Sequence, residues 1–309
     1  MNTLDYDFVR YLDAKKKIDD RALNRRVWDK LSAQLPTTNS RIPLQVLELG
    51  AGIGTMVERF VDWGLLTCAD YTAVDVEADY IREACHRLNH KKLIKVSDLN
   101  PGSLNQSANY TVNSQVAVTF ECADIYRFFE KACGKKKWDL GVAHAFMDLV
   151  NIAEVVPRFC QLIKPKGLLY LTLNYDGETI LLPTVDQEFD QLINQLYNQS
   201  MDERIVNGKR VGDSRTGRHL LYHLIKANAK LLAAGSSDWI VFSGPRGYTQ
   251  DETYFLQFIV HTIYTELKGH ASLNQKQLVS WVKRRRDQIE KGELIFIAKQ
   301  MDVLARVEA

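Results

Sequence analysis

The fold depends on Val46-Leu47-Glu48-Leu49-Gly50-Ala51-Gly52-Ile53-Gly54-Thr55. Apolar residues flank Glu48, and the apolar positions of residues 56–61 have helical spacing. The pattern predicts a buried strand that runs into a glycine-rich turn and then into a helix. The glycines therefore lie at the carboxyl end of a strand, where an open parallel sheet binds a nucleotide cofactor.

The spacing of the glycines indicates which cofactor is bound. A dinucleotide fingerprint, G-x-G-x-x-G, needs a glycine at position 55, where this chain has Thr55. The carboxylate of Glu48 would repel a pyrophosphate, but it suits a ligand that carries an ammonium group and a sulfonium. In this motif the chain resembles the class I S-adenosylmethionine-dependent methyltransferases, whose first motif is an acidic residue followed by G-x-G-x-G.

The resemblance implies an α/β fold, a doubly wound, seven-stranded Rossmann-like sheet whose last strand is antiparallel. It implies S-adenosylmethionine as cofactor and S-adenosylhomocysteine as product. It also places five residues of the first motif at the cofactor: Glu48, Gly50, Ala51, Gly52 and Gly54.

Four further strands follow in the expected order. Residues 72–76 form a short apolar strand, and Asp75 at its end is placed to reach ribose hydroxyls, with Val76 beside it. The third strand, residues 116–125, ends in Ala123, Asp124 and Ile125, which the resemblance places beside the adenine. The fourth strand covers residues 138–147. A helix over 152–163 ends at Lys164-Pro165-Lys166-Gly167 before the fifth strand, 168–173, so the matches extend from Leu44 to Tyr175.

Length and composition agree with one enzyme domain that carries additions. The chain has 309 residues, a net charge of +2 and five irregularly spaced cysteines, which indicates reduced thiols, a cytoplasmic protein and no structural metal site. Basic runs at residues 15–17, 135–137 and 283–286 are interpreted as solvated faces rather than a nucleic-acid stripe. The polar amino terminus is not typical of a signal peptide, and no apolar run reaches membrane-spanning length.

The additions divide the chain into six ranges. We expect a helical cap segment (1–40), the cofactor-binding core (41–177), a cap insertion (178–213), a core continuation (214–244), a helical cap insertion (245–292), and the last strand with the carboxyl terminus (293–309). The sixth and seventh strands are expected at residues 238–242 and 294–301. The polar segment 100–114 is expected to be a surface loop without function.

The topology brings both insertions to the cofactor edge of the sheet. Together with the helical residues 6–35 they are expected to enclose a pocket that excludes water, which favours a small-molecule acceptor over a polymer. The chain lacks the D/N-P-P-Y motif of amino-methylating enzymes that act on adenine or glutamine amide, since the fourth strand ends in His144-Ala145-Phe146-Met147. Cys160 follows Phe159 rather than a proline, and it is interpreted as a core residue.

Methyl transfer to a hydroxyl needs a base, and His144 at the end of the fourth strand is the first candidate. The alternative is a hydrogen-bonded core or cofactor-contacting histidine. Tyr175, His223 and Asp148 are weaker candidates, with alternative roles as a packing residue, a solvated side chain or a helix cap.

Substrate recognition is assigned to Arg215, Arg218, Arg246 and Tyr248, because forked guanidinium donors at the mouth of a site suit a carboxylate or phosphate. In the alternative interpretation, the first two arginines pair with Asp213, Asp251 or Glu252 and hold the cap in place.

The sequence thus predicts a methyltransferase that acts on a small molecule, with oxygen the first expected acceptor and nitrogen the next. No nucleic-acid or membrane partner is expected, and the oligomeric state stays open. Two alternatives are an RNA- or protein-modifying methyltransferase, which needs an open basic face, and a non-catalytic cofactor-binding module.

Overall fold

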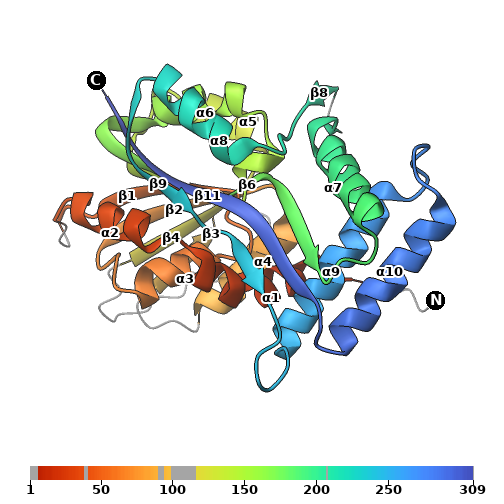
Figure 1. Cartoon of the computed structure of the whole chain (residues 1–309). Helices are drawn as coiled ribbons and strands as arrows, with labels where there is room; N and C mark the ends of the chain where they lie inside the picture. Colours follow the sequence, from red (N-terminus) through yellow and green to blue (C-terminus); the bar gives the residue numbers. More distant parts are fainter. Residues whose placement is uncertain (1–5, 38–40, 90–93, 99–115, 207, 309) are drawn as a thin grey trace.

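The chain folds around one mixed β-sheet that carries helices on both faces and a helical cap at one end (Figure 1). In the computed structural model, residues 6–37, 41–89, 94–98, 116–206 and 208–308 are described. The polar segment 100–114, predicted to be a surface loop, lies outside these residues.

The described sheet has nine strands: β1 (Leu44–Leu49), β2 (Ala69–Asp75), β3 (Ile94–Asp98), β4 (Val116–Cys122), β5 (Trp138–His144), β6 (Ile163–Leu182), β9 (Ala229–Ser236), β10 (Trp239–Val241) and β11 (Ile295–Val307). Their order is β10-β11-β6-β5-β1-β2-β4-β3, and β9 also pairs with β11. The strands from β3 to β6 are parallel neighbours, whereas β11 is antiparallel to β6, β9 and β10. This arrangement confirms the predicted fold class.

Helices cover the two faces of the sheet as separate layers (Figure 1). One layer holds α2 (Arg25–Gln34), α3 (Thr55–Asp62) and α4 (Ala78–Asn89), and the other holds α5 (Ile125–Ala132), α6 (Ile152–Leu162) and α8 (Thr216–Lys226). Each layer buries its own apolar core against the sheet. The apolar stripes predicted from the sequence therefore face the strands.

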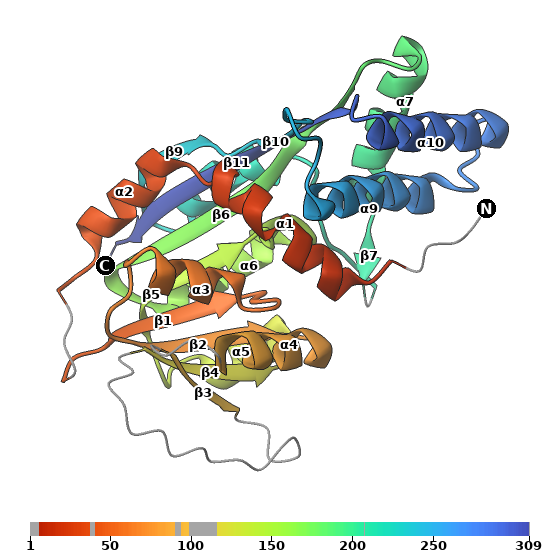
Figure 2. The same ribbon diagram turned by 90° about the horizontal axis from the view of Figure 1, so that it is seen from below.

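The cap consists of α1 (Phe8–Ala22), α7 (Gln187–Asp202), α9 (Gln250–Leu267) and α10 (Gln275–Glu290). Figure 2 shows α9 beside α1 and α10 beside α9. These helices share a third apolar core, in which Phe255 and Trp281 are almost fully buried. A short hairpin of β7 (Ile205–Val206) and β8 (Lys209–Arg210) follows α7.

Two predictions about the additions need correction. The helical stretch 6–35 is two helices, and only α1 joins the cap, because α2 buries Val27, Trp28 and Leu31 in the core on the sheet. The strand predicted at residues 238–242 is β10, but β9, which precedes it, was missed. Its Ala- and Gly-containing sequence has little strand propensity, but pairing with β11 fixes it as a strand.

Strands β6 and β11 are longer than predicted, and they link the core to the cap. Their antiparallel pairing extends from Leu168 opposite Arg306 to Leu182 opposite Ile295, with two irregularities in register. The edge strand β3 was not predicted either. The long β6–β11 ladder carries the cap on the same backbone hydrogen bonds that build the sheet.

Gly141 provides a test of the packing between β5 and α6. A Cβ atom at this position would lie 2.7 Å from Leu169, 2.8 Å from Phe159 and 2.9 Å from Ile163. We expect Gly141→Ala to lower the free energy of unfolding by about 1–3 kcal/mol, because neighbouring side chains must shift. Gly244→Ala is the control, since its nearest atom would lie at 3.9 Å, and equal denaturant midpoints for the two variants would contradict this packing.

Candidate functional site

The glycine-rich turn lies where predicted, between the carboxyl end of β1 and the start of α3. Gly50, Gly52 and Gly54 have φ values of 67°, 53° and 76°, a region that glycine occupies without strain. The N–H groups of Gly50 and Ala51 donate to the carbonyl of Val74 in β2, at 2.9 and 3.1 Å. At Gly50 a Cβ atom would lie 2.1 Å from Cδ2 of Phe146, so only glycine fits beneath that ring.

Asp75 joins this turn to the end of β2. One carboxylate oxygen accepts the N–H of Gly52 at 2.7 Å, and the other accepts the N–H of Glu77 at 3.0 Å. Burial raises the pKa of Asp75, although these backbone hydrogen bonds oppose the shift. The next residue, Val76, is 59% exposed although its side chain is apolar. Such an exposed side chain beside a buried carboxylate is a suitable surface for a flat ring.

The ends of β2 and β4 meet beside Asp75. The N–H of Ala123 donates to the carbonyl of Asp75 at 2.9 Å. Asp124 is the N-cap of α5 and accepts the N–H of Tyr126 at 2.9 Å, while Ile125 is buried in the core beneath that helix. The structure therefore brings Asp75, Ala123 and Asp124 to one edge, but turns Ile125 away from it. Contact of these residues with a cofactor stays a prediction.

Glu48 lies below this edge rather than on it. Its side chain is 1% exposed, and its carboxyl group accepts the Tyr71 hydroxyl at 2.8 Å. Burial raises the pKa of Glu48 to about 8, so the group is protonated at neutral pH. The negative charge that was expected to attract an ammonium group is absent in this environment.

Helix α1 covers the glycine-rich turn. Phe8 near its start stacks on Tyr80 of α4, with ring centroids 5.5 Å apart. Leu12 lies over the turn, with Cδ1 3.6 Å from the position of a Cβ atom on Gly52. The helix then reaches the end of β5. Of residues 6–35, which were expected to help enclose the pocket, α1 is the part that lies over the turn.

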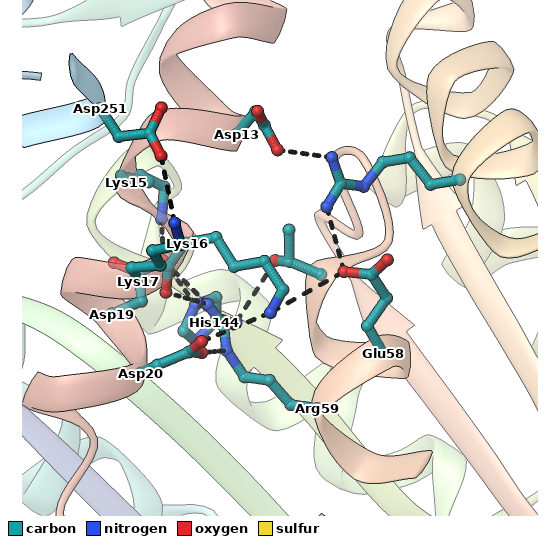
Figure 3. A network of polar contacts seen from close by, with 12 residues as sticks. Asp13, Lys15, Lys16, Lys17, Asp19, Asp20, Glu58, Arg59, His144 and Asp251 are labelled. Carbon is teal, nitrogen blue, oxygen red and sulfur yellow. Dashed lines mark hydrogen bonds and ion pairs between the residues drawn. The ribbon is translucent and has the colours of Figure 1, made fainter. Parts of the chain in front are cut away.

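A buried network of charged groups fixes the second half of α1 (Figure 3). Asp19 is 1% exposed, and its Oδ2 accepts Nζ of Lys15 at 2.6 Å and Nη2 of Arg59 at 3.3 Å. Oδ1 accepts the indole N–H of Trp239 in β10 at 2.9 Å. Burial opposes the ionisation of Asp19, but Lys15 and the neighbouring His144 and Arg59 outweigh it and lower the pKa. The carboxylate is therefore fully charged.

His144 is not free to act as a base, because both of its ring nitrogens have partners. Nδ1 lies 2.8 Å from the Thr172 hydroxyl, and Nε2 lies 2.9 Å from Nη1 of Arg59 and 3.1 Å from Oδ2 of Asp19. Burial, and then the charge of Arg59, lower the pKa of His144 to about 3. This arrangement favours the alternative interpretation, a hydrogen-bonded structural histidine, over a general base.

The weaker catalytic candidates are not brought together. The Tyr175 hydroxyl bonds to Asn198 and Thr179, and burial raises its pKa. His223 lies in the last turn of α8, at the end opposite to the one that meets β6. Asp148 follows β5, and one of its carboxylate oxygens is buried without a hydrogen-bond partner among the described residues.

The predicted substrate-binding residues separate into two places. Arg218 makes a forked ion pair with Asp176 after the core part of β6, with Nε–Oδ1 at 2.8 Å and Nη2–Oδ2 at 3.0 Å. Arg215 lies beside it and lines the same pocket. Arg246 is exposed in the turn after β10, and the Tyr248 hydroxyl donates to the carbonyl of Leu294. The expected convergence of the three arginines is therefore wrong.

Two of the alternative partners, Asp251 and Glu252, were also wrong. Asp251 pairs with Arg10 and Glu252 with Arg21, so both carboxylates hold α1 against α9. Asp213 accepts the backbone N–H of Arg215 and lies against His219. The contacts that pin the cap come from α1, not from the α8 arginines.

Sequence reasoning missed Lys15, Asp19 and Arg59, and it assigned Lys15 to a solvated face. Lys15 is 6% exposed, and Arg285 in another basic run is fully buried against Asp190. A signal was present in the helical spacing, since Lys15 and Asp19 fall on the same stripe as Tyr11 and Ile18. Charges on an apolar stripe indicate a buried ion pair.

In the described part of the chain, no helix is long and apolar enough to cross a membrane. No group of three or more His, Cys, Asp or Glu side chains there is arranged to hold a metal ion.

No family model matches the chain, and no curated protein matches it. Solved structures are similar to it in backbone arrangement. The YcgJ protein from Bacillus subtilis is 13% identical with a TM-score of 0.47, covering 91% of this chain and 99% of its own. A cyclopropane synthase from Mycobacterium tuberculosis is 11% identical with a TM-score of 0.44, and the match covers 90% of this chain and 82% of the synthase. A SAM-dependent methyltransferase from Methanosarcina mazei is 10% identical with a TM-score of 0.42, and the match covers 85% of this chain and 92% of that protein.

Asp19→Asn tests the buried network. The change removes the charge that compensates Lys15 and Arg59, and we expect a loss of about 3–5 kcal/mol in the free energy of unfolding. Asp79→Asn is the control, because its pair with Arg82 is exposed and such pairs contribute about 0–1 kcal/mol. Similar urea midpoints for the two variants would show that α1 is not fixed in this way.

Glu48 gives a prediction about pH. Its pKa is about 8 when folded, against 4.5 ordinarily, so the folded state holds a proton that the unfolded state releases. Its contribution to stability is complete at low pH and is lost as the pH rises, by at most about 1.4 kcal/mol per pH unit. We expect Glu48→Gln to lose less stability than the wild type between about pH 5 and about pH 8. Glu130→Gln, at an exposed position, should keep the wild-type pH profile, and the same profile for Glu48→Gln would refute the buried proton.

Proposed function

We propose that this protein is a methyltransferase that uses S-adenosylmethionine and acts on a small molecule. The observation that carries the proposal is the turn of three left-handed glycines closed by Asp75, at the carboxyl end of β1. There the sheet order reverses, since β2 pairs on one side of β1 and β5 on the other. Open α/β sheets bind their ligands at such a switch point.

The antiparallel strand β11 supports this cofactor over a dinucleotide. Dinucleotide-binding sheets of the 3-2-1-4-5-6 order consist of parallel strands, whereas β11 lies antiparallel between β6 and β9–β10. A second difference from dinucleotide-binding sheets is Thr55, the first residue of α3, which stands where the dinucleotide fingerprint needs its third glycine. The proposal does not need Glu48 as a direct ligand.

The residues at the edge fit the parts of S-adenosylmethionine. The backbone of the turn at Gly50, Ala51, Gly52 and Gly54 would lie along the amino-acid part. The Asp75 carboxylate would accept ribose hydroxyls, Val76 would contact the adenine ring, and Ala123 and Asp124 would lie beside the ring's amino group. The cofactor supplies a methyl group on a sulfonium, which is already activated for transfer.

The cap supports a small acceptor. Helix α1 lies across the turn from Tyr80 to His144, and α9 holds it through Arg10–Asp251 and Arg21–Glu252. A polymer would need an open face at this edge. Exclusion of water would also strengthen the electrostatic contacts made during transfer.

The acceptor atom was first expected to be oxygen because His144 was expected to act as a base. That support is withdrawn, since His144 is neutral and fully bonded. An amine in its free-base form is a nucleophile without a protein base, so nitrogen ranks equally with oxygen. Asp148, with an unpartnered carboxylate oxygen after β5, is the acidic group nearest in the chain to this strand end.

Titration calorimetry with S-adenosylhomocysteine tests the cofactor. We expect binding to the wild type, and we expect Asp75→Asn to weaken it by about 1–3 kcal/mol, because a charged acceptor is lost from the ribose. Asp70→Asn is the matched control, since Asp70 lies at the other end of β2 and accepts from Gln45. Binding of NAD but not of S-adenosylhomocysteine would overturn the proposal.

Transfer of a labelled methyl group distinguishes the acceptor classes. A metabolite extract should accept the label, whereas total RNA and a peptide pool should not. Label in RNA or peptide would replace the small-molecule proposal with the macromolecular alternative. Cofactor binding without transfer to any pool would indicate the non-catalytic module.

A further inference from the structure

A polar pocket of about 460 Å³ lies outside the glycine-rich turn. It is bordered by the extension of β6, by α7 and the start of α8, and by β9, β11 and the turn after β9, and its lining includes Arg215, Glu178, Asn194 and Gln300. Figure 1 shows α8 on one side of the sheet and α1 and α3 on the other. The pocket and the covered turn share no residue, and the volume is within the range of small-molecule sites.

Most charges in the pocket neutralise one another. Arg218 is paired with Asp176, and Lys299 is paired with Asp238 at 2.9 Å. Burial opposes ionisation of Asp238, but Lys299 and the hydrogen bonds from Ser236 and Gln300 lower its pKa. These four groups are therefore engaged with one another, and they form the walls rather than the binding groups.

Two opposite charges are left. Among the described residues, neither the Arg215 guanidinium nor the Glu178 carboxylate has a hydrogen bond or an ion pair. They flank Gly177: Glu178 follows it in the chain, and Cγ of Arg215 lies 3.4 Å from the position of a Cβ atom on Gly177. Gly177 has a φ of 89°, a conformation that glycine adopts without strain, and its lack of a side chain allows Arg215 to lie close to the backbone.

A buried amide adds a second, independent sign of a ligand. Gln300 lines the pocket and is only 5% exposed, and its side-chain oxygen has no hydrogen-bond partner among the described residues. A buried amide that lacks a partner costs free energy unless a ligand or water supplies one. Asn194 of α7 uses its oxygen on the N–H of Thr179, which leaves its NH₂ group available to the pocket.

We propose that this pocket binds a small zwitterion of the amino-acid class. Its carboxylate would pair with Arg215 in the forked geometry that a guanidinium offers. Its ammonium group would pair with Glu178, and the amides of Gln300 and Asn194 would bond to its polar atoms. Arg246 and Tyr248, which were expected to take part, lie outside the pocket. The site does not depend on the proposed methyl transfer.

The proposal is tested by calorimetric titration of the full chain with glycine, L-serine and L-glutamine. Each is compared with its N-acetyl derivative, which lacks the ammonium group, and with its methyl ester, which lacks the carboxylate. At least one free amino acid should bind, and its two derivatives should bind at least about tenfold more weakly. Arg215→Gln and Glu178→Gln should each weaken the amino acid by a similar factor, while Arg246→Gln, an exposed arginine outside the pocket, should not.

Equal binding of an amino acid and its N-acetyl derivative would overturn the zwitterion and leave an anion site at Arg215. No binding of any of the three amino acids at millimolar concentration would overturn the proposal as a whole. S-adenosylhomocysteine is titrated into the same variants and should bind as it does to the wild type. Its failure to bind the wild type would count against the proposed function alone.

Discussion

The arrangement of core and cap depends on the buried carboxylate of Asp19. Lys15, Arg59, His144 and Trp239 all bond to it, and they come from α1, α3, β5 and β10. A buried charge is tolerated only when such partners compensate for lost water. The position of α1 is therefore fixed from several directions at once, and this in turn places Leu12 over Gly52 and the carboxylate of Asp19 beside the buried His144.

Much of the fold could be predicted because its signals are local. The glycine turn, the acidic ends of β2 and β4, and the helices of the cap each follow from a short pattern of residues. The strand β9 escaped because its Ala- and Gly-containing sequence has low strand propensity, and only pairing with β11 fixes it. The division of residues 6–35 into two helices was equally hard to predict, since Asn24 caps α2 within a stretch whose apolar residues keep helical spacing throughout.

The site was predictable in position but not in chemical state. That Glu48 lies beneath the turn follows from its strand, but its protonation follows from its burial by the assembled sheet, which outweighs the opposing hydrogen bond from Tyr71 of the neighbouring strand. His144 was correctly placed at a strand end, whereas its partners Asp19 and Arg59 lie on two helices far from it in the chain. Arg218 was expected to bind the substrate or, in the alternative, to pair with Asp213, Asp251 or Glu252, and its partner is Asp176 across the β6–α8 contact. Pairings of this kind depend on tertiary contacts that no local pattern contains.

The long ladder between β6 and β11 limits how the molecule can move. A cap that is joined to its core by loops can close like a jaw about a hinge. Here the same two strands carry hydrogen bonds from the centre of the sheet into the cap, so a jaw motion would have to tear that ladder. Any ligand that reaches the glycine turn must therefore do so while the core and the cap stay joined along this ladder.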